Sequence, residues 1–432
     1  MKSKILESMN IPRVARISCY ALAISTVVAA TAWAAESRTV ADGVRIYPAS
    51  NTRYAGDVGV RAHTFLVVIK PKQGSGNHPG YTGGPPFSGY GIETPASIEC
   101  VYKFAPSVDG CNPNQVTTEK VGGTDVIAIV DAYAYPSGPA GGSAVQAKSD
   151  LAAYSSQFGL PAPNANNFEV VRSGNPTSAA GTGWDLEEAL DIEMAHAYAP
   201  KAKVILVEAA SDAFTDMYTA VGVAAGLVQT AGSGEVSMSW GGEEYSGETS
   251  DDSTFTGYTN VVFYASSGDS AGTSYPCVSP NVVCVGGTSH SRNASTLALQ
   301  KQFTWSEEGG GASLYEAAPP YQSSVSTSAR LVPDVAAIAD PNAGVWVYNC
   351  TYFGGNCYWI EVGGTSVASP TVASLDNQRG FFASNSDAYL MTLYGSSGAG
   401  FGDITYGYCG VNYPVASIAG WDNCTGWGSP KN

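Results

Sequence analysis

Continuous apolar runs alternate with helix-like stretches from residue 126 onward. The runs have the length and composition of buried parallel strands, and they cover residues 126–130, 203–209, 236–240, 261–265, 282–285 and 344–348. The stretches between them are closed by Gly or Pro or follow small-residue turns, and they predict helices at 149–158, 184–198, 213–228 and 367–377. Such alternation predicts an α/β fold in which a mostly parallel central sheet is flanked by helices on both faces.

The chain before residue 126 has a weaker pattern. It contains one strand-like run, Thr64 to Ile69, and a helical or extended arm at 96–104. Between them, residues 73–92 are rich in Gly, Pro and Ser, a composition typical of a linker. We therefore expect a short prosegment-like region with a linker at 35–92 and the main domain at 93–432, including its C-terminal region.

The first 34 residues have the pattern of a secretory signal. A basic start is followed by an apolar stretch and by Ala32-Trp33-Ala34, which suits a cleavage site. The alternative is a membrane anchor, but the apolar stretch is marginal in length and is interrupted by hydroxyl residues. We predict a signal peptide at 1–34 and a secreted, extracellular product that is not held in a membrane.

Charge narrows the choice of partners. Asp and Glu number 37 against 21 Lys and Arg, which gives a formal net charge of −16 at pH 7. Such an acidic chain is a poor ligand for nucleic acid or anionic membranes, so neither is expected as a partner. It also suits an acidic medium, in which protonation of carboxylates relieves repulsion within the chain.

Eight cysteines follow Cys19, which lies in the predicted signal, and they occur in close pairs. An even number in a secreted chain favours disulfides over a metal site, because no C-x-x-C pair is present and histidine is scarce. We predict four local bridges: Cys100–Cys111, Cys277–Cys284, Cys350–Cys357 and Cys409–Cys424.

Ser366 follows a turn of small residues and opens a predicted helix. Free backbone N–H groups at a helix N-terminus can hold an oxyanion, so this is a suitable place for a nucleophile. An N-cap serine with a structural role is the alternative. None of the four histidines lies in a His-Gly-Thr context, and His196, on the helix 184–198, remains a weaker candidate for the base.

Carboxyl groups offer another base. Glu187 and Asp191 are four residues apart on one predicted helix, so they share a face and can share a proton at acidic pH. A solvated acidic helix face is the alternative. Asp269 follows a predicted strand, and when protonated it can donate a hydrogen bond to an oxyanion. Both assignments imply activity in acid.

Together these motifs resemble the sedolisin family, the serine-carboxyl peptidases. The resemblance covers roughly residues 93–431 and rests on Glu187-x-x-x-Asp191, Ser239-Trp240-Gly241, Gly268-Asp269-Ser270 and Gly364-Thr365-Ser366. It implies a subtilisin-like three-layer fold. It also implies that Glu187 is the general base, Asp191 its supporting carboxyl, Asp269 the oxyanion donor and Ser366 the nucleophile. Trp240 would line the substrate cleft.

The resemblance further implies one structural calcium ion. Its expected ligands are the side chains of Asp403 and Asp422 and the carbonyls of Ile404, Ile418 and Gly420. The expected protein is a monomeric, acid-active serine endopeptidase that acts on proteins or peptides. Sedolisins usually carry a large prosegment, whereas only residues 35–92 are available here.

Two other functions remain as alternatives. One is a non-catalytic secreted binding protein on a peptidase-like scaffold, which a substitution at one of the four key positions would favour. The other is a serine hydrolase that uses His196 as its base.

Overall fold

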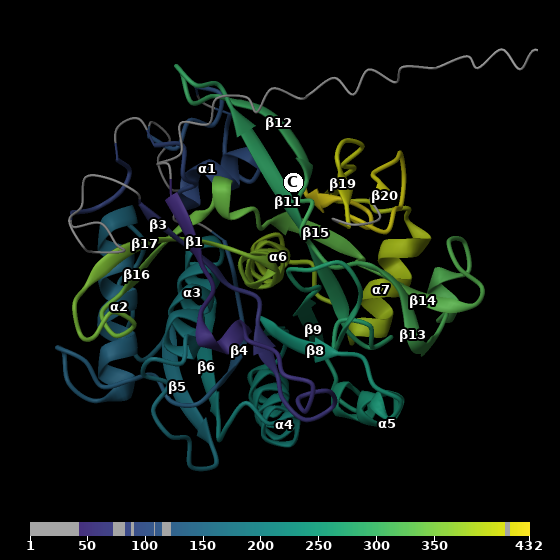
Figure 1. The fold of residues 1–432 in the computed structure, drawn as a ribbon, viewed down its shortest axis with the longest axis horizontal. Coiled ribbons are helices and arrows are strands. Elements are labelled where there is room, and N and C mark those ends of the chain that lie inside the picture. The colour runs from purple at the N-terminus through teal and green to yellow at the C-terminus, as the bar shows by residue number, and fades with distance from the viewer. Residues whose placement is uncertain (1–42, 72–82, 88–89, 108, 115–121, 411–414) are drawn as a thin grey trace, which may run out of the picture. The chain divides into compact units, whose positions relative to one another are not determined.

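The central element of the computed structural model is an eight-stranded sheet (Figure 1). Its strands run in the order β12-β11-β9-β7-β4-β6-β5, and β15 also pairs with β11. All pairs are parallel except β11 with β12. The strands are β4 (Val126–Ala132), β5 (Phe168–Ser173), β6 (Lys203–Ala209), β7 (Gly234–Met238), β9 (Val261–Ser266), β11 (Val283–Arg292), β12 (Leu299–Thr304) and β15 (Val335–Ile338).

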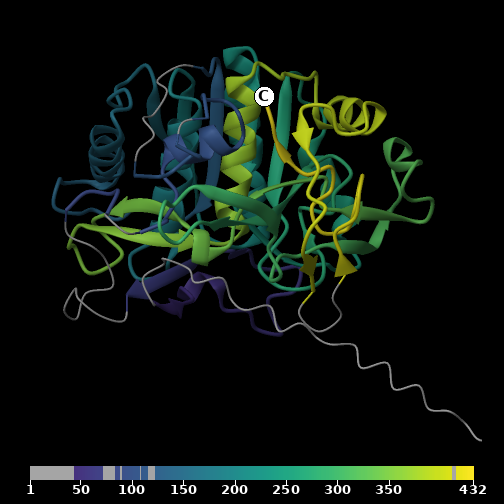
Figure 2. The ribbon, with the colours of Figure 1, turned by 90° about the horizontal axis from the view of Figure 1, so that it is seen from above.

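Helices cover both faces of this sheet (Figures 1 and 2). Along β4, Ile127 and Ile129 enter one apolar core while Ala128 and Val130 enter the other, as the two-residue period of a strand requires. The first core contains α2 (Ser143–Phe158), α3 (Trp184–Tyr198) and α6 (Thr365–Gln378), and the second contains α4 (Phe214–Ala231). The predicted three-layer α/β fold is confirmed.

Most predicted elements occur near their expected bounds. The helix expected at 184–198 and the strand at 203–209 match α3 and β6, while the helix expected from 149 begins earlier, at Ser143. Several strands escaped prediction, among them β12 and β15 of the central sheet, its partly exposed end strand β5, and β17 (Tyr358–Gly363), whose run contains the buried Glu361. The strand expected at 236–240 divides into β7 and β8 (Trp240–Glu243).

A second, antiparallel sheet joins the N-terminal region to the strand before Ser366. Its order is β1-β3-β17-β16, with β1 at Gly43–Ile46, β3 at Val67–Pro71 and β16 at Val345–Asn349. Figure 1 shows purple β1 and β3 beside green β17. This sheet crosses the domain boundary expected at residue 93, and the described residues from 43 onward belong to one compact unit.

The remaining elements are short. Helix α1 (Pro95–Val101) occupies the arm expected at 96–104, and α7 (Ser386–Gly395) follows α6. The others are α5 (Glu248–Asp251), β2 (His63–Thr64), β10 (Ser274–Tyr275), β13 (Gly311–Ala317), β14 (Ala329–Val332), β18 (Phe401–Gly402), β19 (Tyr408–Cys409), β20 (Val415–Ala416) and β21 (Ser429–Pro430).

The structure describes residues 43–71, 83–87, 90–107, 109–114, 122–410 and 415–432. The predicted signal peptide and most of the predicted linker lie outside these residues. All four predicted disulfides are formed. Within the described ranges, no helix combines the length and the apolar character that crossing a membrane would require.

Candidate active site

Ser366 lies in the first turn of α6, where the chain turns sharply out of β17. Gly364 precedes the helix with a φ of +107°, in the left-handed region that favours glycine. A Cβ at Gly364 would lie 1.9 Å from the Phe65 carbonyl oxygen and 2.6 Å from Asp269 Oδ2. Glycine thus lets the chain approach closely, and both oxygens border the same small space beside the helix N-terminus.

The Ser366 hydroxyl group is buried between two backbone groups. It accepts a hydrogen bond from the Phe65 N–H at 3.1 Å and donates one to the Ser239 carbonyl at 3.1 Å. The Ser366 N–H donates to the Phe65 carbonyl at 3.2 Å. None of these partners is a histidine, so the surroundings of the hydroxyl do not provide the imidazole base on which most serine peptidases depend.

Three buried carboxyl groups gather near Ser366. Glu187 and Asp191 come from α3, and Asp131 comes from β4 near its carboxyl end. Among the described residues, no hydrogen-bond partner exists for either oxygen of Glu187 or Asp131, or for Asp191 Oδ2. Asp191 Oδ1 accepts a hydrogen bond from the Ser239 hydroxyl at 2.9 Å. Buried carboxylate oxygens without hydrogen-bond partners cost free energy unless the carboxyl groups retain their protons.

Burial raises the pKa of all three carboxyl groups. The pKa of Asp131 rises to about 8 because of desolvation. Desolvation raises the pKa of Glu187 well above its usual value, the charge of Asp131 adds to this, and the nearby Ser366 hydroxyl lowers it. The pKa of Asp191 rises through desolvation and the charges of Asp131 and Glu187. The cluster therefore retains protons well above the usual carboxyl range.

Asp269 approaches Ser366 from the loop after β9. Its Oδ1 accepts hydrogen bonds from the Thr365 N–H at 2.8 Å and the Thr365 hydroxyl at 2.9 Å. Its Oδ2 is buried and has no partner among the described residues. Desolvation raises the pKa of Asp269 to about 7, against the lowering effect of Thr365 and Arg53. A protonated Oδ2 could donate toward the carbonyl that the Ser366 N–H already contacts.

The remaining sequence candidates take different positions. The Trp240 side chain is buried in the core beneath α4 and donates to the Val130 carbonyl at 2.8 Å, so only its backbone faces the N-terminal segment. His196 is bonded through Nε2 to the Pro161 carbonyl at 2.7 Å. The sequence places Asp131 at the carboxyl end of a predicted strand, where sites form in such sheets, but gives it no specific role. It gives no role to Ser239 or Phe65.

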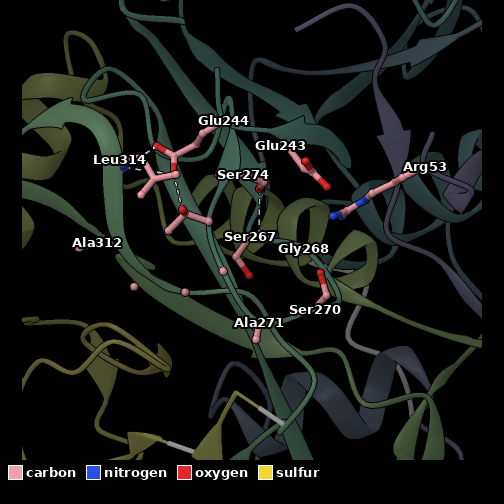
Figure 3. A pocket seen from close by; sticks show the side chains of 14 residues that line it. Arg53, Glu243, Glu244, Ser267, Gly268, Ser270, Ala271, Ser274, Ala312 and Leu314 are labelled. Carbon is pink, nitrogen blue, oxygen red and sulfur yellow. Dashed lines mark hydrogen bonds between the residues drawn. The ribbon is translucent and has the colours of Figure 1, made fainter. Parts of the chain in front are cut away.

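A pocket of about 480 Å³ opens beside the Asp269 loop (Figure 3). Its lining includes Arg53, Glu243 and the loop residues Ser267, Gly268 and Ser270. Arg53 extends toward Glu243 and Ser270 in Figure 3. The pocket is polar, and Gly268 in its lining donates a hydrogen bond to the hydroxyl of Thr365, the neighbour of Ser366.

The five expected calcium ligands lie on two neighbouring loops. The Gly420 N–H donates to Asp403 Oδ2 at 2.8 Å, which links the loops. Asp422 accepts hydrogen bonds at both carboxylate oxygens, from the N–H groups of Ile418, Cys424 and Thr425. The donor set consists of oxygens, which suits calcium. Because backbone N–H groups already satisfy Asp422, that carboxylate also stabilises the turn without an ion.

Comparisons with known proteins identify the class first. The Subtilase family model (Peptidase_S8) matches residues 177–375, which include Glu187, Asp269 and Ser366. The solved structure of Pseudomonas sedolisin, a serine-carboxyl proteinase complexed with pseudo-iodotyrostatin, superposes with a TM-score of 0.61. That match has 23% identity and covers 78% of this chain and 95% of the other. The fold is that of subtilisin-like peptidases.

Sequence relatives then narrow the class to a family. Kumamolisin from Bacillus sp. (strain MN-32) is 30% identical over 376 residues, 78% of this chain and 62% of that protein. Sedolisin from Pseudomonas sp. (strain 101) is 32% identical over 181 residues, 38% of this chain and 29% of that protein. The chain is thus similar in sequence to sedolisins, and it spans less than two thirds of the length of these two relatives.

Proposed function

We propose that this protein is an acid-active serine-carboxyl endopeptidase that hydrolyses proteins or peptides through an acyl-enzyme on Ser366. One observation carries the proposal: the Ser366 hydroxyl lies against a buried cluster of carboxyl groups, and no histidine is among its hydrogen-bond partners. The roles of Glu187, Asp191, Asp269 and Ser366 expected from sequence suit this geometry.

In the proposed reaction, Ser366 Oγ attacks the carbonyl carbon of the substrate while Glu187 accepts the hydroxyl proton. Asp191, with Asp131 beside it, keeps a proton within the cluster and stabilises the protonated Glu187. The oxyanion accepts hydrogen bonds from the Ser366 N–H and protonated Asp269. Glu187 then gives its proton to the leaving amine. Water attacks the ester in the same way, giving a carboxylic acid and free Ser366.

The test is peptide hydrolysis by the Ser366→Ala variant. Removal of the nucleophile should lower the rate by roughly 10⁴-fold or more. Circular dichroism should give the fold of the wild-type chain, because the hydroxyl makes only two hydrogen bonds. Activity that survives the substitution would contradict the proposal. A wild-type chain that binds peptides and cuts none would favour the alternative of a binding protein.

We also propose that the protein is secreted and that it holds one calcium ion on the loops of Asp403 and Asp422. Four disulfides support an oxidising compartment. The side chains of Asp403 and Asp422 and the carbonyls of Ile404, Ile418 and Gly420 would supply the oxygens. We further expect a monomer.

Chelation tests the calcium proposal. An ion that binds only the folded chain adds to stability by mass action, so a chelator should lower the melting temperature by several degrees. Asp403→Asn should abolish that shift. Asn166, in the exposed loop before β5, provides the matched control. Asn166→Ala should leave the effect of chelation on the melting temperature unchanged. A melting temperature that does not respond to the chelator would argue against a structural ion.

A further inference from the structure

Three of the segments that line the pocket beside Asp269 meet at one carboxyl group. Glu244 directly follows β8, and Figure 3 shows it beside Leu314 of β13. It accepts hydrogen bonds from the Thr273 hydroxyl, in the loop after Asp269, and from the Ser313 hydroxyl in β13. The Leu314 N–H donates to both oxygens of Glu244, at 3.1 Å and 3.2 Å. Glu244 therefore sets the distance between these segments.

The same segments are joined by backbone contacts next to Asp269. The Gly309 N–H donates to the Gly268 carbonyl at 2.8 Å. The Gly310 N–H donates to the Gly272 carbonyl, also at 2.8 Å. Because Gly268 immediately precedes Asp269, these contacts hold β13 against the loop that carries the proposed oxyanion donor. The remaining freedom of β13 lies farther along the strand, where Glu244 binds it.

Glu248, in α5, is the group that supports Glu244 from within the fold. It is fully buried, and its Oε2 accepts a hydrogen bond from the Tyr245 N–H at 2.8 Å. Its Oε1 receives no hydrogen bond from the described residues, although the Glu244 carboxyl lies within hydrogen-bonding reach of Glu248. Two carboxyl groups form such a bond only when one of them carries a proton. Glu244 already accepts from three residues, so the proton belongs on Glu248.

The surroundings of Glu248 keep that proton in place. Burial raises the pKa of Glu248 to about 9, against the lowering effect of the Tyr245 N–H, and the carboxyl groups of Glu244 and Glu316 raise it further. Glu316, in β13, is also buried, and desolvation and the charge of Asp252 raise its pKa to about 7. Ionised Glu248 would lie unpaired beside other carboxylates, which is unfavourable. Glu248 therefore remains a hydrogen-bond donor in acid and at neutral pH.

We propose that Glu248 is a positioning residue for substrate binding: its carboxyl donates a hydrogen bond that holds Glu244 in the orientation that joins the pocket segments. The inference rests on the proposed function, because it takes this pocket to bind a side chain of the peptide substrate. No covalent bond changes at Glu244 or Glu248. Glu248 acts only through Glu244, so it should affect the binding of substrate and leave the chemical step at Ser366 nearly unchanged.

The first test compares Glu248→Gln with Glu248→Ala in the hydrolysis of an added peptide in acid. Gln keeps a donor for Glu244 and an acceptor for the Tyr245 N–H, so kcat and KM should stay within about twofold of the wild-type values. Ala has no donor, so KM should rise by about fivefold to tenfold while kcat changes by less than about threefold. Unchanged KM in Glu248→Ala, or a Gln variant that behaves like Ala, would overturn the proposal.

Glu235→Ala is the matched control for a general loss of stability. Glu235 is also buried with a raised pKa, and it accepts a hydrogen bond from Asn377 Nδ2 at 2.7 Å. It lies at the start of β7, at the end of the strand opposite the pocket. KM should stay at the wild-type value in this control. An equal rise in Glu235→Ala and Glu248→Ala would show that loosening of the fold, and not the pocket, raises KM.

Hydrogen exchange measures the pocket segments without any catalytic readout. The probe is the segment 311–317, because its Leu314 N–H is bonded to Glu244. In the Ser366→Ala background, mass spectrometry should find that this segment exchanges about fivefold faster or more in Glu248→Ala, and at the original rate in Glu248→Gln. Glu248→Leu, which fills the space without a donor, replaces the Ala variant if that chain does not fold. Equal exchange with and without the donor would contradict the proposal.

A double variant tests whether Glu248 acts through Glu244. Glu244→Ala should itself raise KM, and the addition of Glu248→Ala should raise it no further, because both changes remove the same contact. Effects that multiply would overturn this route.

The outcomes also separate this inference from the proposed function. If peptides are hydrolysed with dependence on Ser366 while KM does not respond to Glu248→Ala, the positioning role is wrong and the peptidase stands. If no peptide is hydrolysed, the proposed function fails. The exchange of the segment 311–317 then still decides whether the Glu248 donor holds Glu244 in place.

Discussion

The hydroxyl hydrogen of Ser366 points to the Ser239 carbonyl while the N-terminal strand lies over it. Neither oxygen of Glu187 has a hydrogen-bond partner among the described residues, although the hydroxyl is close enough to lower the pKa of Glu187. A rotation about the Ser366 Cβ–Oγ bond would redirect the proton to the base. The residues are thus close to a reactive arrangement, and small movements separate it from the arrangement observed.

The proposed role of Glu187 as the base can be tested against another buried glutamate of the same helix, α3. Glu187→Gln should lower kcat by about 10²-fold to 10⁴-fold, because an amide of similar shape cannot accept the proton. Glu193→Gln is the matched control. Glu193 is also buried on α3, but it accepts hydrogen bonds from the Tyr348 N–H, which an amide oxygen can replace. Equal activity of the two variants would rule out Glu187 as the base.

Asp269 should determine the neutral side of the pH profile. In the proposed reaction it donates to the oxyanion only when protonated, and burial raises the pKa of Asp269 to about 7. Activity should therefore fall as the pH rises through this region. Asp269→Asn keeps a donor at every pH and should weaken that fall, whereas Asp269→Ala should lose about 10²-fold to 10³-fold at all pH values. The comparison is made from pH–rate profiles of the three proteins.

At the scale of elements, the turn between β17 and α6 does most to assemble the site. β17 ends where it pairs with β3, and α6 begins one residue after Gly364. The strand, the turn and the helix N-terminus therefore bring together Ser366, the proposed oxyanion donors and the N-terminal segment that contacts Ser366. A change in the backbone at this turn would disturb all three.

Gly364→Ala tests this turn. The added Cβ would meet the Phe65 carbonyl and Asp269 Oδ2, and the positive φ would strain any other residue. We expect loss of peptide hydrolysis and a destabilisation of about 1–3 kcal/mol, measured by denaturant unfolding. In Gly395→Ala the new Cβ would meet no atom within 4 Å, so this control should be near neutral. A fully active Gly364→Ala would contradict the close packing of Phe65.

Over the whole compact unit, many carboxyl groups are buried with raised pKa values. Desolvation raises the pKa to about 6 for Asp150 and Asp185 and to about 8 for Asp131. Desolvation also raises the pKa well above its usual value in a larger set of carboxyl groups: Glu187, Glu188, Asp191, Glu193, Glu235, Glu308 and Glu361. Glu93 is the opposite case. Burial favours a higher pKa there, but the interactions of Glu93 with Arg292 and His290 outweigh it and lower the pKa to about 2.

This balance predicts a protein that is more stable in acid than at neutral pH. A carboxyl group with a raised folded pKa stabilises the fold fully below its unfolded value, near 4. That contribution is lost as the pH rises toward the folded value, because the unfolded chain ionises first. The melting temperature of Ser366→Ala, which should not digest itself, should therefore be higher at pH 4 than at pH 7.

A salt series separates burial from general repulsion between surface charges. High salt screens the surface charges but leaves buried groups largely unaffected. Most of the difference in melting temperature between pH 4 and pH 7 should therefore remain in high salt. A melting temperature that rises from pH 4 to pH 7 would contradict the prediction. So would a difference that disappears when salt is added.

The sequence by itself determined the elements with strong periodicity, and it carried the hypothesis for the chemistry of the main site. Apolar runs such as 203–209 predicted central strands because both faces of those strands are buried. The close cysteine pairs predicted the four bridges. The spacing of Glu187 and Asp191, with Ser366 after its small-residue turn, predicted a nucleophile served by carboxyl groups. Each of these signals is local, so neighbouring residues are enough to carry it.

Only the tertiary structure decided which distant segments meet. Asp131 lies near Glu187 and Asp191 because β4 packs beside α3. The spacing of these residues along the chain does not predict that they meet. The strand-like run at 64–69 is divided at Phe65 because two separate sheet edges capture its halves. Backbone pairing with β8 and β17 depends on where those edges lie in space. The segment that sequence reasoning placed before the domain therefore lies across its nucleophile.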